Sequence, residues 1–184
     1  MAIEKRVSRM ILGDFNILIS TSRGNERNAC SEAWFLLGEI GDREAVVEKT
    51  EISGLIAAKT VLDRFSVIKD FRKMLEERPG EFRYILRVIP IELETRSSLD
   101  EIKKAVAKIH NQILEKETFR ITVEKRHSEL STKEIIREAA SGIERKVDLE
   151  NPDKIVLIEV LGGSTGVSIV TPNDVLSIVK EKPR

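Results

Sequence analysis

One segment of the sequence limits the possible folds more than any other. Residues 155–161 (Ile-Val-Leu-Ile-Glu-Val-Leu) are almost continuously apolar, with a single glutamate among them. A run of this length without alternation is typical of a β-strand that is covered on both faces. Asn151-Pro152 breaks the chain before this run, and Gly162-Gly163 turns it afterwards. The segment is therefore predicted to be a buried strand bounded by turns.

The first half of the chain alternates between strand and helix patterns. Apolar residues at helical spacing predict helices at residues 26–40 and 63–77, each followed by a glycine or a proline. Short apolar or alternating runs predict four strands, at residues 16–20, 45–52, 55–60 and 82–93. The resulting order, β-α-β-β-α-β, is that of a ferredoxin-like unit.

The second half begins after a short polar segment at residues 93–98, which we interpret as an inter-domain linker. Ser98 with Glu101, and Ser131 with Glu134, have the spacing of capping boxes and predict the starts of two helices. The second of these helices is predicted to bury five apolar residues: Ile135, Ile136, Ala139, Ala140 and Ile143.

An alternating strand at residues 119–123 separates the two capped helices. After the buried strand, residues 167–170 are predicted to form a further strand, and Thr171-Pro172 to cap a short terminal helix. We therefore predict an α+β protein with domains at residues 1–92 and 93–184.

The charge balance rules out a general attraction to polyanions. The 184 residues include 31 Lys and Arg against 31 Asp and Glu. Any affinity for nucleic acid must therefore come from local placement of basic groups, and it should be modest and sensitive to salt. The single cysteine, Cys30, cannot form an intramolecular disulfide and fits a reducing compartment.

Targeting signals are also missing from the sequence. The amino terminus has only a short apolar stretch at residues 10–12, and no segment approaches the roughly 20 apolar residues of a membrane span. We expect a cytoplasmic globular protein without membrane association.

The sequence contains no recognisable catalytic constellation. His110, His127 and Cys30 cannot make a conventional zinc site unless carboxylates supply the remaining ligands. The Gly-Gly-Ser-Thr-Gly run at residues 162–166 lacks the lysine of a phosphate-binding loop and is followed by β-branched residues, which favours a hairpin turn. We expect no catalytic residues, no metal and no cofactor.

A small cationic corner is the more informative feature. The strand that begins at residue 119 delivers Lys125 and Arg126 at its carboxyl end, and Lys133 and Arg137 follow on one face of the next helix. The N–H groups at the start of that helix also suit a phosphate. The same pattern fits a set of surface ion pairs with Glu124, Glu129 and Glu134.

Four motifs in the second half closely resemble the THUMP domain. They are Phe-Arg-Ile-Thr-Val-Glu-Lys-Arg at residues 119–126, Lys-Glu-Ile-Ile at 133–136, Val-Asp-Leu-Glu-Asn-Pro-Asp at 147–153 and the apolar strand. The resemblance covers about residues 85–175, and it implies tRNA binding. In this family a ferredoxin-like domain commonly precedes the THUMP domain, and the two together recognise the acceptor end of tRNA.

Because no catalytic domain follows the motifs, the arrangement is similar to that of the stand-alone tRNA acetylation adaptors. The Ser-Thr-Ser-Arg-Gly-Asn-Glu-Arg segment at residues 20–27 also looks like that group. The resemblance implies a non-catalytic protein that presents tRNA to an N4-acetylcytidine acetyltransferase. Two alternatives stay open: a THUMP subunit of a split sulfurtransferase or methyltransferase, and a ferredoxin-like protein-interaction module that binds no RNA.

The resemblance and the cationic corner together nominate six RNA-binding residues. Lys125 and Arg126 are the main phosphate-contacting candidates, and Lys133, Arg137 and Arg120 support them. Arg23, in the first domain, is a weaker candidate. The residues at positions 151–153 are expected to fix a turn.

Overall fold

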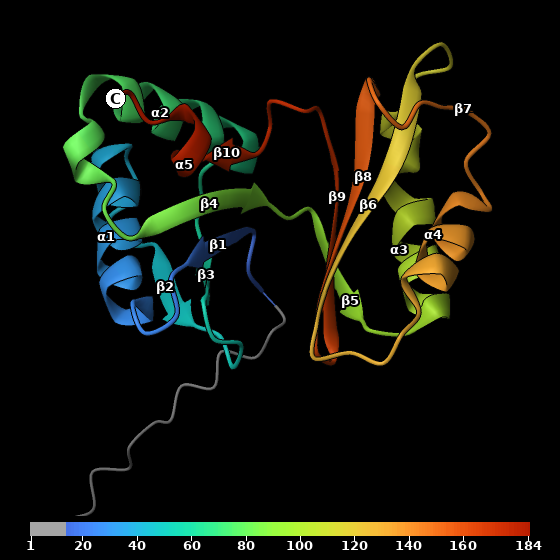
Figure 1. The fold of residues 1–184 in the computed structure, drawn as a ribbon, viewed down its shortest axis with the longest axis horizontal. Helices are drawn as coiled ribbons and strands as arrows, with labels where there is room; N and C mark the ends of the chain where they lie inside the picture. Colours follow the sequence, from blue (N-terminus) through green and yellow to red (C-terminus); the bar gives the residue numbers. More distant parts are fainter. Residues whose placement is uncertain (1–13) are drawn as a thin grey trace, which may run out of the picture.

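The computed structural model describes residues 14–184, which form two five-stranded sheets with helices on both sides (Figure 1). The first 13 residues of the predicted first domain, including the apolar stretch at 10–12, lie outside the described residues. The mixed α and β content and the two-unit arrangement confirm the predicted fold class.

The first sheet has the predicted ferredoxin-like order. Its elements are β1 (Ile17–Thr21), α1 (Glu26–Glu39), β2 (Val46–Lys49), β3 (Leu55–Lys59), α2 (Arg64–Glu77) and β4 (Ile85–Pro90), with a 3-10 turn at Pro79–Glu81. The strands lie in the order β4-β1-β3-β2, and all neighbours are antiparallel. Asp63 caps α2 by accepting a hydrogen bond from the Ser66 amide at 2.8 Å.

The second sheet is mixed, in the order β5-β9-β8-β6-β7. Its elements are β5 (Leu93–Arg96), α3 (Leu99–Ile109), β6 (Thr118–Arg126), α4 (Thr132–Ala140), β7 (Lys146–Val147), β8 (Lys154–Leu161) and β9 (Ser164–Val170), with a 3-10 turn at His110–Gln112. β6 runs parallel to β8 and β7, whereas β9 is antiparallel to both β8 and β5.

The interpretation of residues 93–98 as a linker is wrong for their first part. β5 pairs with β9 from Leu93↔Val167 to Arg96↔Ser164, so this polar segment is an edge strand of the second sheet. An edge strand has a neighbouring strand on one side only, and more of it is exposed to solvent than a central strand. Its side chains can therefore be polar while its backbone is hydrogen-bonded to the neighbouring strand.

The serine N-cap of each predicted capping box is confirmed at the helix starts. The Ser98 hydroxyl accepts from the Glu101 amide at 3.2 Å, and the Ser131 hydroxyl accepts from the Glu134 amide at 3.4 Å. In α4, however, Ile136 is 37% exposed, although it was predicted to be buried. Only one narrow face of this helix meets the sheet, and Ile135 and Ala139 occupy that face.

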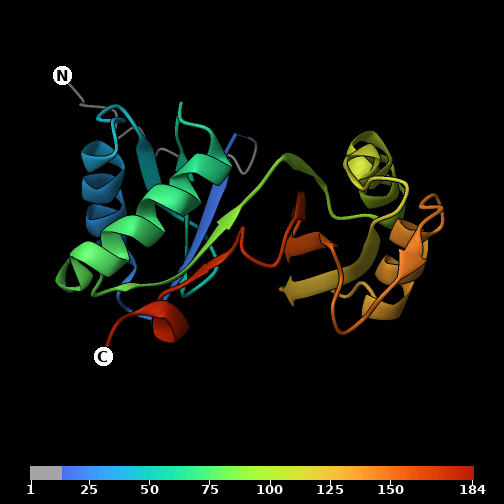
Figure 2. The same ribbon diagram turned by 90° about the horizontal axis from the view of Figure 1, so that it is seen from above.

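The two sheets turn their inner faces toward each other, and the helices cover the outer faces (Figures 1 and 2). Alternate residues of β1 demonstrate this: Ile17 and Ile19 pack in the core under α1 and α2, whereas Leu18 packs in a core between the sheets. β8 contributes to two cores in the same way, with Val156 facing α3 and α4 and Leu157 facing the first sheet. Both faces of β8 are therefore covered, as its continuous apolar run predicts.

The carboxyl-terminal segment does not stay with the second sheet. β10 (Leu176–Ser177) pairs with β4, and α5 (Ile178–Glu181) packs Ile178 into the core of the first sheet. The division at 93–184 therefore assigns this segment to the wrong unit, because a two-residue strand has no period to read. Thr171 does not cap a helix but donates its amide to Asp174 at 2.7 Å. Among the helices of residues 14–184, none is long and apolar enough to cross a membrane.

Candidate nucleic-acid interface

The structure separates the two basic residues that the sequence places together at the end of β6. Successive side chains of a strand point to opposite faces of the sheet. Phe119, Ile121 and Val123 face α3 and α4, so Lys125 lies on that side and Arg126 on the side of the first sheet. The two side chains therefore cannot act as one phosphate clamp.

Arg126 forms an ion pair with the buried carboxylate of Glu159. Its Nη1 donates to Glu159 Oε2 at 3.0 Å, and the Glu159 side chain is fully buried whereas that of Arg126 is 30% exposed. Burial raises the pKa of the Glu159 carboxyl, and the charges of Arg126 and Arg87 oppose that shift. Arg126 of β6 therefore compensates the buried charge of Glu159 on β8. The other Glu159 carboxylate oxygen has no hydrogen-bond partner in the described part of the chain.

The rest of the predicted cationic corner assembles at the start of α4. Lys125 Nζ donates to the Leu130 carbonyl at 2.5 Å, just before the Ser131 cap, and Lys133 stands exposed in the first turn. Arg137 lies 3.8 Å from carboxylate oxygens of both Glu134 and Glu138, and 70% of its side chain is exposed. The corner is thus open to solvent, and part of its charge is matched by acidic neighbours.

Arg120 occupies a different place, on the face of β6 that looks toward the first sheet. The turn at residues 148–153 orients it, because Arg120 Nη1 donates to the Leu149 carbonyl at 3.0 Å. Two carboxylates hold that turn: Asp148 accepts two backbone amides within it, and Asp153 accepts the Thr118 amide at 2.8 Å. This backbone hydrogen bond is the main cause that lowers the pKa of Asp153. The signature turn therefore fixes a structure, as predicted, and that structure positions an arginine.

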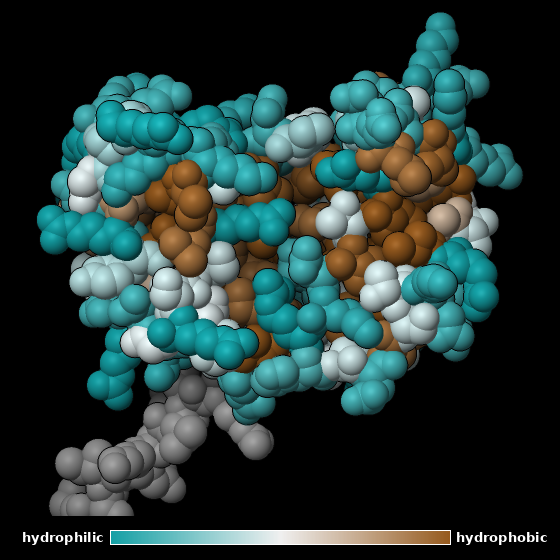
Figure 3. Space-filling view, viewed as in Figure 1, coloured by the Kyte–Doolittle hydropathy of each residue, from teal (hydrophilic) through white to brown (hydrophobic). Residues whose placement is uncertain are grey.

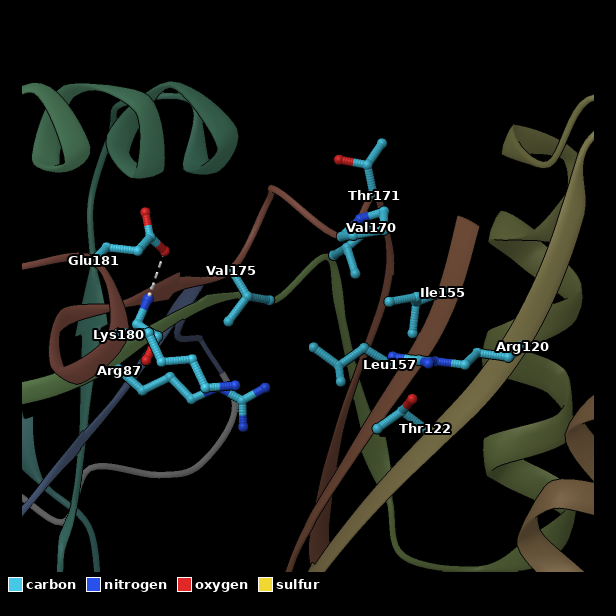
Figure 4. A pocket seen from close by; sticks show the side chains of 12 residues that line it. Arg87, Arg120, Thr122, Ile155, Leu157, Val170, Thr171, Val175, Lys180 and Glu181 are labelled. Carbon is cyan, nitrogen blue, oxygen red and sulfur yellow. Dashed lines mark hydrogen bonds between the residues drawn. The ribbon is translucent and has the colours of Figure 1, made fainter. Parts of the chain in front are cut away.

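Arg120 points into a groove between the two sheets, which we name the inter-sheet groove. The groove has a volume of about 440 Å³ and an apolar floor that includes Ile155, Leu157 and Val170. Arg87 of β4 and Lys180 of α5 point into it from the other side, opposite Arg120 (Figure 4). In the space-filling view, apolar surface lies between hydrophilic side chains where the two units meet (Figure 3).

The cations of the inter-sheet groove form no ion pair within residues 14–184, although Glu181 also lines the groove and the Arg87 charge acts on Glu159. Within residues 14–184, the side chains of Arg87 and Lys180 make no hydrogen bond and no ion pair, and Arg120 Nε is buried without a partner. The hydroxyls of Thr122 and Ser177 also line the groove. Unpartnered cations beside hydroxyl groups can bind the oxygens of a phosphate, because each supplies hydrogen-bond donors to a negative acceptor.

Of the six candidates, only Arg120 lies in this groove, and Arg23 lies outside it in the loop after β1. Arg87 and Lys180 were missed by the reasoning from sequence. Arg87 belongs to an alternating strand and Lys180 to a one-turn helix, and no local pattern distinguishes either from an ordinary surface cation. Only the pairing of β10 with β4 brings the two together.

The glycine-rich run and the possible metal ligands do not form a second site in the described residues. The glycine-rich run is a hairpin between β8 and β9, and Gly162 has a φ of 61° at its turn. No group of three or more His, Cys, Asp or Glu side chains that could hold a metal occurs among residues 14–184.

Comparisons with known proteins identify the second unit. The THUMP domain family matches residues 96–170. An uncharacterised protein of Methanocaldococcus jannaschii, MJ0421, is 31% identical over 121 residues, which are 63% of this chain and 34% of that protein. The chain therefore spans about a third of the length of its curated relative.

Solved structures share the arrangement of both units. PH1313 from Pyrococcus horikoshii aligns over 85% of this chain and 55% of its own, with a TM-score of 0.57 and 18% identity. TrmN from Thermus thermophilus aligns over 83% and 44%, with a TM-score of 0.56 and 13% identity. A 4-thiouridine synthetase in complex with RNA and ATP aligns over 89% and 42%, with a TM-score of 0.54 and 16% identity. These likenesses establish the fold, and the family match places a THUMP domain at residues 96–170, within the second unit.

Proposed function

We propose that this chain binds tRNA and that phosphates of the RNA backbone occupy the inter-sheet groove. The observation that carries the proposal is the convergence of Arg87, Arg120 and Lys180 on one groove beside a THUMP domain. These cations come from both units, so the RNA contacts the ferredoxin-like unit and the THUMP domain together. The acceptor end of tRNA is the proposed ligand, as the family resemblance implies.

The proposed binding is electrostatic and moderate in strength. Each phosphate neutralised by a cation contributes a slope of roughly −0.7 to −0.9 to the dependence of log K on log salt. Three contacts therefore predict a slope of about −2 to −3 from the groove. The chain as a whole has no net charge, so it supplies no additional long-range attraction.

The test is tRNA binding measured by fluorescence anisotropy across a series of salt concentrations. Arg87→Ala and Lys180→Ala are each expected to weaken binding and to reduce the slope by about one phosphate equivalent. Lys73→Ala is the matched control, since Lys73 is 73% exposed on the helical surface and paired with Glu77 at 3.9 Å. Binding that is absent, or that does not change with salt, would contradict the proposal.

The cationic corner is tested in the same series. A Lys125→Ala, Lys133→Ala double variant removes the two exposed lysines at the start of α4 without touching the Arg126–Glu159 pair. If this variant loses tRNA while the groove variants bind normally, the RNA lies on the corner. Equal losses in both sets would place the RNA across the two surfaces.

We further propose that the chain is a non-catalytic, cytoplasmic adaptor that presents tRNA to an N4-acetylcytidine acetyltransferase. The support is the resemblance of the segment at residues 20–27 to the acetylation adaptors. Nucleoside analysis of tRNA from cells that lack the protein tests this step, and the expected result is loss of N4-acetylcytidine. Unchanged N4-acetylcytidine would refute the acetylation role and leave tRNA binding intact.

A subunit of a split modification enzyme is the second candidate. It is favoured by the fold shared with a 4-thiouridine synthetase, of which this chain covers 42%. Incubation of the purified protein with tRNA and each group donor separates the two, because a new modified nucleoside would refute the adaptor. A protein-interaction module without RNA is distinguished by a pull-down after nuclease treatment combined with absent tRNA binding.

A further inference from the structure

The segment at residues 171–182 connects the two units a second time, after the crossing between β4 and β5. It leaves β9 at Val170, turns at residues 171–175, and adds β10 and α5 to the first unit. We name it the carboxyl-terminal strap. Lys180, one of the three cations of the inter-sheet groove, belongs to the strap, so the position of the strap determines where that charge lies.

The backbone of the strap is weakly held by its own secondary structure. β10 pairs over two residues only, at Leu176↔Val88 and Ser177↔Arg87. α5 has four residues, and a single helical turn is not stable by itself because its nucleation is unfavourable. Leu176 and Ile178 anchor one side of the strap in the core of the first sheet.

Two polar side chains anchor the strap to the first unit: Lys182 Nζ donates to the Phe82 carbonyl at 2.8 Å, and Arg72 of α2 makes three further hydrogen bonds. Its Nε donates to Glu181 Oε2 at 2.6 Å, and its Nη2 donates to the carbonyls of Asn173 and Val175 at 2.9 and 3.3 Å. Three acceptors spread over nine residues of the strap are thus held by one guanidinium group, whose side chain is 25% exposed. The fork of an arginine suits this geometry, whereas a lysine ammonium cannot span all three positions.

Glu181 links this anchor to the groove. Its Oε1 accepts from the Ser177 amide at 3.1 Å while its Oε2 accepts from Arg72, so the carboxylate closes α5 against α2. Lys180 is the neighbouring residue, and its side chain leaves the helix toward the groove (Figure 4). Rotation or fraying of this one turn would move the Lys180 ammonium away from Arg87 and Arg120.

We propose that Arg72 is a positioning residue for RNA binding: it lies outside the inter-sheet groove and sets the location of Lys180 by clamping the strap. This inference rests on the proposed function, since it assigns a structural control to the same groove. It predicts that substitution of Arg72, which does not contact the RNA, changes RNA affinity by displacing the Lys180 ammonium group.

The experiment is a double-mutant cycle on the full chain, with Arg72→Ala, Lys180→Ala and the combined variant, measured as tRNA affinity across a salt series. Lys180→Ala is expected to weaken binding about five- to tenfold near 0.1 M salt and to reduce the salt slope by about 0.7–0.9, the value of one phosphate contact. Arg72→Ala is expected to weaken tRNA binding at least threefold and to show part of the decrease in salt slope that Lys180→Ala shows. The combined variant should match Lys180→Ala, because the two changes act through the same ammonium group.

Two controls guard against a general loss of structure. Lys73→Ala removes the adjacent, solvent-facing cation of α2 and should leave affinity and slope unchanged. Arg72→Lys keeps a positive charge opposite Glu181 and should restore part of the binding. Hydrogen exchange at residues 173–182 should be faster in Arg72→Ala, while the amides of β1 and β8 keep their protection.

The outcomes are distinct. If the wild-type chain binds tRNA and Arg72→Ala binds equally well with an unchanged slope, the positioning role is refuted and the proposed function stands. If the losses of the two single variants multiply in the combined variant, Arg72 does not act through Lys180 and the inference is also wrong. If the wild-type chain binds no tRNA, the proposed function and this inference fall together.

Discussion

Arg126 and Lys125 are adjacent in the sequence, and the structure predicts opposite consequences for their removal. Arg126→Ala would leave the fully buried Glu159 carboxylate without its only ion-pair partner in the described part of the chain. Lys125→Ala would remove an exposed side chain that donates a hydrogen bond to the Leu130 carbonyl. The pair of variants therefore separates a residue that stabilises the fold from one that is available to RNA.

The magnitude follows from the burial of each partner. Removing one member of a buried ion pair costs about 3–5 kcal/mol, because the remaining charge is left uncompensated. Arg126 is 30% exposed, so solvent screens part of its interaction and the lower end, roughly 3 kcal/mol, is expected. For a chain of this size that corresponds to a decrease of about 6–12 °C in the melting temperature. Lys125→Ala should stay within about 0.5 kcal/mol of wild type.

The pH dependence gives a second, independent test. The folded-state pKa of Glu159 is raised, so its contribution to stability is fully present below the unfolded pKa and is lost as pH rises through the folded pKa. Without Arg126 the folded pKa rises further. The destabilisation of Arg126→Ala should therefore be small in acid, where Glu159 is protonated, and should grow toward neutral pH.

Urea unfolding followed by circular dichroism at about pH 5 and pH 7.5 measures both effects. Glu159→Gln in the Arg126→Ala background is the matched control, because a neutral side chain of the same size should remove the pH-dependent part of the loss. Equal free energies of unfolding for Arg126→Ala and Lys125→Ala, or a deficit that does not change with pH, would refute the reasoning. Loss of tRNA binding in Arg126→Ala alone would not by itself identify an RNA contact.

Four further predictions concern packing, capping, the cysteine and the carboxyl-terminal strap. A Cβ at Gly166 would lie 3.0 Å from two side-chain carbons of Ile91, so Gly166→Ala should destabilise the chain by about 1–3 kcal/mol in urea unfolding. Ser98→Ala removes the cap of α3 and should cost about 1 kcal/mol by the same measurement, whereas Ser98→Asp should retain most of the stability. Burial raises the pKa of the Cys30 thiol to about 11, so its thiolate fraction, and hence its alkylation rate at neutral pH, should be about 100-fold below that of the unfolded chain. Burial alone would raise the pKa of Glu181, but the hydrogen bonds from Arg72 and the Ser177 amide outweigh burial, and the net effect is a lowered pKa. The carboxylate therefore stabilises the strap above the unfolded pKa, and this stabilisation is lost as pH falls through the folded pKa. Hydrogen-exchange protection of the strap should follow the same pH dependence.

The features that the sequence predicts correctly are local ones. The caps at Ser98 and Ser131 depend on residues three positions apart, and the hairpin at Gly162 depends on neighbours in the chain. The burial of β8 on both faces also follows from its own apolar run. Each of these patterns contains all the information that its structure needs, because the interacting groups are close in sequence.

The features that the sequence does not predict depend on distant pairings. β5 looks like a linker because its partner β9 lies about 70 residues away, and β10 is too short to show a period. The opposite orientation of Lys125 and Arg126 follows from the alternation of β6 and could have been inferred from the same pattern that predicts the strand. The grouping of Arg87 with Lys180 could not, because it requires the strap to return to β4.

The zero net charge of the chain is compatible with binding a polyanion because the charges are not evenly matched in space. Many surface cations have an acidic neighbour, as Arg78 has Glu39 at 2.9 Å, and Arg126 is neutralised by a buried carboxylate. Within residues 14–184, the groove cations Arg87 and Lys180 form no ion pair, although Glu181 also lines the groove and the Arg87 charge acts on the buried Glu159 carboxyl. A phosphate in this groove would gain from local charge while the rest of the surface contributes little. The salt dependence of tRNA binding should therefore report the number of cations in the groove rather than the composition of the whole chain.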